Sequence, residues 1–187
     1  AGNKTAQGKT DASGLGDFYY TPPTGYKALC SKNLSPTSIV RPQKHFETLE
    51  YTGQNTSSLY NVTGLEFTPD FVWAKTKNDT VGHVMIDTVR GDDRQIQGDV
   101  NDAEVLRGTP SYRFLKDGFA VSTGGNMNNP KNYAAYCWKA GGAAVSNTDG
   151  SITSSVSANQ EAGFSICSFT INTSGVYTIG HGLGKAP

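Results

Sequence analysis

The sequence predicts an all-β chain whose main part is a β-sandwich or jelly-roll-like domain, with a short N-terminal remnant of a preceding domain. Three observations favour this class. Charged residues make up 17% of the chain, below the roughly 25% of an average soluble domain, while Gly contributes 22 residues. The residues that long helices need are scarce. Short apolar segments alternate with turn residues throughout, as in sandwiches and barrels.

Strands are expected where aromatic or β-branched residues alternate with polar ones. These segments are residues 18–21, 26–30, 46–51, 58–63, 71–75, 83–88, 112–115, 118–122 and 132–139. Lys116-Asp117-Gly118 predicts a tight hairpin between two of them. One helix of one or two turns is expected at 101–107, where Asn101 or Asp102 can cap the first turn.

Turn-rich segments divide the chain into three predicted parts. Residues 1–34 comprise an extended or disordered arm, 1–17, and the terminal strands of the preceding domain. Residues 35–145 form the central β-sandwich and begin with a linker signal, Ser35-Pro36-Thr37. Residues 146–187 form a Gly-, Ser- and Asn-rich linker and the first hairpin of a following repeat domain.

An internal repeat supports this division. The segment FETLEYTGQNTSSLYNVTGLEFTP, residues 46–69, resembles FSICSFTINTSGVYTIGHGLGKAP, residues 164–187. Phe46 aligns with Phe164, and Pro69 aligns with Pro187 at the same offset. We therefore expect each copy to be a strand-turn-strand unit that opens a domain, and the parent protein to continue beyond the second copy.

The charge balance argues against several partners. Sixteen cationic and sixteen anionic residues give a net charge of zero, so no basic field attracts nucleic acid or an anionic membrane. No apolar run is long enough for a transmembrane helix. Gly124-Gly125 and Gly141-Gly142 lack the Lys-Ser/Thr of a phosphate loop, and no cofactor is expected.

The three cysteines, Cys30, Cys137 and Cys167, are widely spaced. This spacing suits neither a disulfide framework nor a zinc site, and it favours buried, reduced thiols.

Asp87, Arg90, Asp92 and Asp93 form the densest charged cluster. Oxygen ligands suit a calcium loop, but the spacing lacks the EF-hand pattern. A strand-end turn in which Arg90 pairs with a carboxylate is the favoured interpretation.

Acidic residues also raise the question of a glycosidase pair, which would have to face each other across a cleft. Glu47 with Glu50 is one candidate set, and Asp99, Asp102 and Glu104 are another; solvated turn charges are favoured for both. The histidines His45, His83 and His181 are scattered without a catalytic motif. The sequence thus predicts no catalytic or metal-binding residues and no enzyme.

Surface recognition has two sets of candidates. Aromatic rings stack on sugars, and the exposed candidates are Tyr19 and Tyr20. Loops carry recognition, which makes Asn126, Asn128 and Asn129 in a Gly-Gly-Asn-Met-Asn-Asn segment surface candidates, although a plain loop is the favoured interpretation. Other aromatic residues also suit stacking, namely Trp73, Tyr133, Tyr136 and Trp138. Phe71 shares a strand face with Trp73, as Tyr136 does with Trp138, and we expect both of these pairs in the core.

Several stretches carry a family resemblance. They are GDFYYTPPTGYKALCSKNL (16–34), FTPDFVWAKTKN (67–78), HVMIDTVRG (83–91), KDGFAVSTGGNMNN (116–129) and YAAYCWKAGG (133–142). Together they resemble modules of tail-fibre and virion appendage proteins of bacteriophages, especially of the marine and cyanophage type. The first stretch resembles the end of a lectin-like sandwich.

This resemblance implies a non-enzymatic structural or adhesion protein, made in the host cytoplasm and located in the virion. It further implies a homotrimer, contacts with other virion proteins, and recognition of host-surface glycans. The alternatives are a capsid decoration or head-fibre protein, a glycan depolymerase module, and a cellular adhesin.

Overall fold

The computed structural model describes residues 4–35, 39–108 and 110–186, and the chain folds as two compact units, Ala1–Ser38 and Ile39–Pro187. The predicted boundary at 34/35 lies close to the division between these units. The predicted parts 35–145 and 146–187 both belong to the second unit. Pro36 and Thr37 of the predicted linker and Pro187 of the repeat lie outside the described residues.

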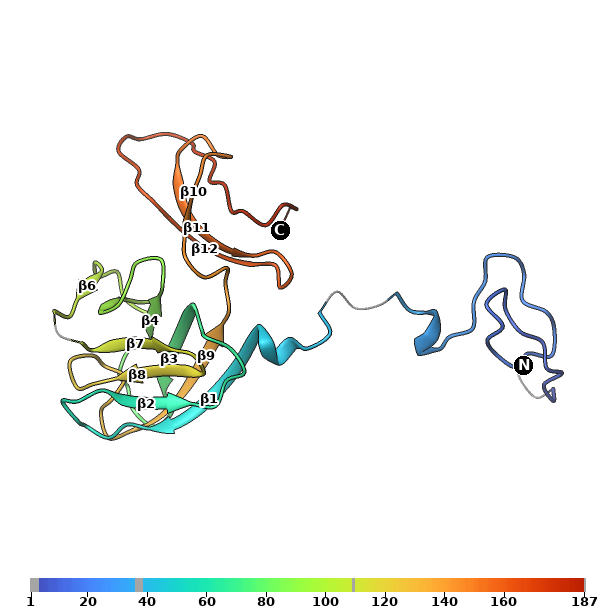
Figure 1. Ribbon diagram of the computed structural model, residues 1–187, viewed down its shortest axis with the longest axis horizontal. Coiled ribbons are helices and arrows are strands. Elements are labelled where there is room, and N and C mark those ends of the chain that lie inside the picture. Colours follow the sequence, from blue (N-terminus) through green and yellow to red (C-terminus); the bar gives the residue numbers. More distant parts are fainter. Residues whose placement is uncertain (1–3, 36–38, 109, 187) are drawn as a thin grey trace. The chain divides into compact units, whose positions relative to one another are not determined.

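The second unit is built from strands, which confirms the all-β prediction (Figure 1). Within the described residues its sheets are antiparallel, with strand orders β1-β9-β3-β4-β5-β6, β2-β8-β7 and β10-β11-β12. The strands are β1 (Phe46–Thr52), β2 (Tyr60–Thr63), β3 (Phe71–Thr76), β4 (Val84–Asp87), β5 (Arg94–Gln97), β6 (Val105–Leu106), β7 (Tyr112–Leu115), β8 (Gly118–Val121), β9 (Asn132–Trp138), β10 (Val145–Asn147), β11 (Ser154–Asn159) and β12 (Phe164–Phe169).

The core lies between the first two sheets. Strands β3, β4 and β9 turn small and aliphatic side chains inward, and β2, β7 and β8 face them with larger ones. Because side chains alternate along a strand, every second residue reaches this core. Its members are Val62, Leu65, Phe67, Val72, Ala74, Val84, Ile86, Tyr112, Phe119, Val121, Met127, Ala135 and Cys137. Burying each larger aliphatic or aromatic side chain contributes about 1.5–3 kcal/mol.

The expected hairpin between the first two strands is wrong. Strand β1 pairs with β9, and β2 pairs with β8, so the two strands lie in different sheets. In the second copy of the repeat, β12 pairs with β11, and Ile179 forms an isolated bridge with Ile152. The repeat therefore marks equivalent strands whose partners differ between the two copies. Strands β1 and β2 pair with strands far away in the sequence, whereas β12 pairs with the preceding strand β11.

The sheet β10-β11-β12 includes two strands that the sequence did not reveal, in the segment expected to be a linker. Ser154 and Ser157 are buried in β11, where composition suggested a flexible connector. Their hydroxyls donate to main-chain carbonyls, at 3.2 Å to Gly180 and at 2.7 Å to Gly142. These hydrogen bonds allow small polar residues to occupy buried positions.

The helix expected at 101–107 is also wrong. Val105 and Leu106 instead form β6, which pairs with Gln95 and Arg94 of β5. Two short 3-10 helices, η1 (Ser31–Asn33) and η2 (Pro42–Lys44), occur elsewhere. Sheet pairing thus overrides a weak local helix signal. No helix in the described part of the chain combines the length and the apolar character that a membrane span requires.

Hydrogen bonds to the carboxylate of Asp11, and not strand pairing, organise the first unit. The strands expected at 18–21 and 26–30 are absent from its described residues, apart from an isolated bridge between Lys9 and Phe18. Asp11 accepts hydrogen bonds from the backbone N–H groups of Ser13, Leu15 and Ala28 and from the side chain of Asn33. These bonds lower the pKa of Asp11 to about 2, with those from Ala28 and Leu15 contributing most. The described part of the predicted arm is therefore a folded loop.

Candidate functional site

The outer face of the six-stranded sheet carries an aromatic row, which we define as Trp73, Tyr136 and Trp138. The register places Trp73 of β3 directly opposite Tyr136 of β9, with ring centroids 6.0 Å apart. Tyr136 and Trp138 alternate along β9, with centroids 6.4 Å apart. Trp73 is 36% exposed and Tyr136 is 40% exposed. Two large rings thus lie side by side in contact with solvent.

The row has different neighbours at its two ends. Phe46, Phe71 and Phe164 surround Trp138, with ring centroids at 4.8, 5.4 and 5.9 Å, and Phe164 is stacked on the indole. Trp138 is therefore the enclosed end of the row. At the open end, Thr48 lies opposite Tyr136, and Met85 lies opposite Trp73.

His83 holds the Trp73 ring in place. The Trp73 indole N–H donates to Nδ1 of His83 at 2.9 Å, and the two rings lie 5.5 Å apart. The backbone N–H of His83 donates in turn to Oδ1 of Asp99 at 3.0 Å. Because Nδ1 accepts this hydrogen bond, the ring proton of the imidazole is carried on Nε2.

Charges beside the row are engaged with partners. The Lys75 ammonium donates at 3.0 Å to the carbonyl and hydroxyl oxygens of Thr76 and to the carbonyl oxygen of Asp79. Lys77 pairs with Glu50 at 2.7 Å. The charged groups beside the row are thus already bound to other groups of the protein.

A comparison with known protein families matches residues 41–187 to a family described as a domain of unknown function. The chain belongs to the DUF7483 family. No curated protein and no solved structure matches the chain. The family region includes both the sandwich and the sheet β10-β11-β12, so the whole aromatic row lies within the DUF7483 domain.

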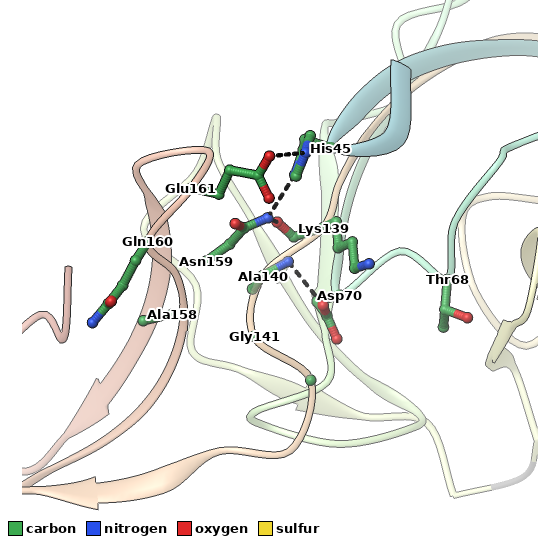
Figure 2. Close-up of a pocket in the computed structure, with 11 residues that line it drawn as sticks. His45, Thr68, Asp70, Lys139, Ala140, Gly141, Ala158, Asn159, Gln160 and Glu161 are labelled. Atoms are coloured by element: carbon green, nitrogen blue, oxygen red, sulfur yellow. Dashed lines mark hydrogen bonds and ion pairs between the residues drawn. The ribbon is translucent and has the colours of Figure 1, made fainter. Parts of the chain in front are cut away.

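A polar pocket marks the junction between the sandwich and the sheet β10-β11-β12 of the DUF7483 domain. Figure 2 shows Asn159 and Glu161 pointing toward His45. The Asn159 amide donates to Nδ1 of His45 at 3.0 Å, and Glu161 lies 3.7 Å from Nε2. Asp70 is buried and accepts from the Ala140 N–H at 2.8 Å and from the Thr88 hydroxyl at 3.2 Å. The hydrogen bonds of these side chains connect different elements of the fold.

The asparagine loop predicted as a recognition surface connects two segments of the DUF7483 domain through hydrogen bonds. Asn128 is 0% exposed, so its prediction as a surface contact is wrong. Its side chain accepts from the Gln54 N–H at 2.7 Å and donates to the Thr56 carbonyl at 3.3 Å. Asn126 and Asn129 are half-buried and contact the hydroxyl of Tyr133 through their backbones. The Asn128 side chain therefore ties this loop to the segment of Gln54 and Thr56.

Tyr19 and Tyr20 precede the DUF7483 region and belong to the first unit. Both are exposed, and their rings meet edge to face at 4.6 Å. Lys4 donates to the Tyr20 hydroxyl at 3.0 Å and lies 4.6 Å from the centre of the Tyr19 ring.

The acidic cluster forms the predicted ion pair. The Arg90 guanidinium donates to Oδ2 of Asp87 at 2.5 Å, which confirms the pairing with a carboxylate. Asp93 accepts from the backbone N–H groups of Ser111 and Tyr112, and Asp92 contacts Arg113 at 3.2 Å. Among the described residues, no group of three or more His, Cys, Asp or Glu side chains could hold a metal ion.

Three members of the two acidic sets considered for a glycosidase pair, Glu50, Asp99 and Glu104, have other contacts. Glu47 and Glu50 are three positions apart on β1 and therefore point to opposite faces. Glu104 binds Arg90 and Arg94, and Asp99 accepts the N–H of His83.

The sequence reasoning missed the aromatic row because it assigned the Phe71/Trp73 and Tyr136/Trp138 pairs to the core. The structure turns both pairs outward and corrects this. The signal was present in the intervening residues. Val72 lies within the first pair and Cys137 within the second, and these smaller side chains are buried between the two packed sheets.

Proposed function

We propose that this DUF7483 domain is a non-enzymatic structural and adhesion module of a phage-type virion appendage, and that its aromatic row contacts glycans of the host surface. The exposure of Trp73 and Tyr136 on a sheet face carries the proposal. Exposed aromatic residues grouped on one face of a soluble protein mark a contact surface.

The chemistry of the row supports a glycan over other contacts. Aromatic rings bury the C–H faces of sugars while neighbouring polar groups hydrogen-bond the hydroxyls. A nucleic acid would also stack on such rings, but it requires a cationic groove along its backbone. Lys75 and Lys77 already have partners, and the net charge of the chain is zero.

The location in a virion tail or appendage, the homotrimer, and the contacts with other virion proteins rest on the sequence resemblance described above. Within this proposal the sandwich is the scaffold, and the outer sheet face is the adhesive surface. The Asp11-centred first unit provides a separate folded segment for attachment to neighbouring virion proteins.

A glycan array probed with the labelled chain tests the adhesive role. We expect binding by the wild type and its loss in the double variant Trp73→Ala, Tyr136→Ala. Tyr26→Ala is the matched control because it removes an exposed aromatic ring from the first unit. Equal binding by the double variant would contradict the proposed contact surface. Release of reducing ends from a bound polysaccharide would contradict the non-enzymatic role.

A further inference from the structure

Trp73 and Tyr136 form a two-ring platform that runs across the strands rather than along them. The two residues are direct cross-strand neighbours, and the same row of the register continues to Thr48 on one side and to Met85 on the other. A ligand that lies along this line of cross-strand neighbours crosses β1, β9, β3 and β4 in turn. The centroids of the two rings lie 6.0 Å apart, and the ring planes are inclined to each other by 49°.

The two flanks of the platform differ in chemistry. On one side stand Phe46, Phe71 and Trp138, an apolar ridge in the adjacent row of the register. On the other side lie Lys75, whose ammonium donates to three neutral oxygens, and the ion pair of Glu50 and Lys77. A ligand on the platform therefore has one apolar flank and one polar flank, and on the polar flank both ammonium groups are already engaged by protein acceptors.

His83 adds direction to the platform. Its Nδ1 accepts the Trp73 indole N–H, which fixes the ring, and its Nε2–H remains as a neutral donor beside that ring. Holding a platform ring in one orientation before binding lowers the entropic cost of binding.

We infer that the two-ring platform binds an uncharged, linear glycan that lies across the strands. Two consecutive sugar units stack on Trp73 and Tyr136, and His83 positions Trp73. This inference rests on the proposed function and specifies its ligand class. The platform contacts sugar units inside the neutral glycan chain, because the sheet extends past both rings, to Thr48 on one side and to Met85 on the other.

Isothermal titration with oligosaccharides of increasing length tests this inference. The probes are neutral glucose and mannose oligomers from one to six units, with galacturonate oligomers of the same lengths as anionic counterparts. We expect affinity for the best neutral series to rise roughly tenfold from one unit to two or three, and to change little beyond that length. We expect anionic oligomers to bind at least tenfold more weakly, with little dependence on salt. Affinity that is independent of length, or that favours the anionic series, would overturn the inference.

Variants separate the two roles of the platform. Trp73→Ala and Tyr136→Ala should each lower affinity roughly tenfold and remove the difference between one and two units. His83→Ala should lower affinity and broaden the NMR signal of the Trp73 indole. His83→Asn keeps an acceptor where Nδ1 stood, so it should restore the indole signal and part of the affinity. Wild-type affinity in both ring variants would refute the platform.

The same variants distinguish failure of this inference from failure of the proposed function. Glycan binding that survives in both ring variants leaves an adhesion module with a different site. A lack of binding to both oligomer series would sink the inference, whereas detection of the chain on purified phage particles would still support the appendage role. Sedimentation of wild type and variants gives a further check: if Trp73→Ala changes the oligomeric state instead of glycan affinity, the face is a contact between copies of the chain.

Discussion

Phe46 and Phe164 occupy equivalent positions in the two copies of the repeat, and both pack against the same indole ring, that of Trp138. Their ring centroids lie 4.8 and 5.9 Å from it. The first copy contributes its phenylalanine from the edge strand of the sandwich sheet, and the second copy contributes it from β12. One residue of β9 therefore links the sandwich to the sheet β10-β11-β12.

Phe164→Ala should loosen the sheet β10-β11-β12 while the sandwich stays folded. The variant loses the stacked contact with Trp138 and the contact with Phe71, which together are worth about 1–2 kcal/mol. Hydrogen exchange should accelerate at the amides of β11 and β12 and remain slow in β3 and β9. Phe169→Ala on the same strand is the control, because Phe169 is 46% exposed. Equal exchange in the two variants would show that the aromatic contact does not hold the sheet.

Gly118→Ala should destabilise the sandwich by about 2 kcal/mol or more, as overpacking with a backbone shift does. A Cβ at this position would lie 2.0 Å from the carbonyl oxygen of Val62 on the paired strand β2. The backbone must move, because no flexible side chain can give way. Urea unfolding measures the effect, and Lys116→Ala in the adjacent turn is the exposed control. Equal stability of the two variants would rule out the close approach.

Acid should unfold the first unit at the point where Asp11 becomes protonated. Its folded pKa of about 2 lies below the ordinary value of 3.8, so the stabilisation is complete above pH 3.8 and is lost as the pH falls through about 2. NMR exchange at the amides of Ser13, Leu15 and Ala28 follows this loss. Asp11→Ala should lack protection at these amides even at pH 5, whereas Asp17→Ala, which removes one hydrogen bond from Gly8, should retain it. Protection that persists in Asp11→Ala would contradict the role of the carboxylate.

Cys137 should resist alkylation in the folded chain. Its thiol is fully buried, and burial, with a smaller effect from Glu47, raises its pKa to about 12. At pH 8 almost no thiolate forms, and reagents cannot reach the sulfur. Cys30 and Cys167 are only half-buried and should react first. Mass spectrometry after a timed thiol pulse should show Cys137 modified at the rate of unfolding. Early modification of this residue would mean that β9 is not a buried central strand.

Most strands of the sandwich could be predicted because their signal is local. Residues 46–51, 71–75 and 132–139 alternate between inward and outward positions, and the observed strands β1, β3 and β9 follow these bounds within one residue. The hairpin of β7 and β8 is confirmed in the same way, since Lys116 and Asp117 form its two-residue turn. Strands β10 and β11 escaped prediction because Gly, Ser and Asn dominate the sequence around them. In β11 the buried hydroxyls of Ser154 and Ser157 find their main-chain acceptors only in the folded sheet.

The aromatic row was predictable in its residues but not in its position. Alternation grouped Phe71 with Trp73 and Tyr136 with Trp138, and the sheet keeps both groupings. Which face looks inward depends on the opposing sheet, whose large Phe119 and Tyr112 leave room only for smaller partners such as Val72 and Ala135. Similarly, the burial of Asn128 depends on the tertiary structure, which packs its loop against Gln54 and Thr56.

The sequence by itself determined the all-β class, most strand positions of the sandwich and the repeat, because residue alternation and turn chemistry act over a few neighbouring positions. The tertiary structure decided strand partners, the inward face of each strand and the exposure of Trp73 and Tyr136. Those features depend on contacts between residues far apart in the chain, whose packing volumes and hydrogen-bond partners are fixed only when the sheets come together.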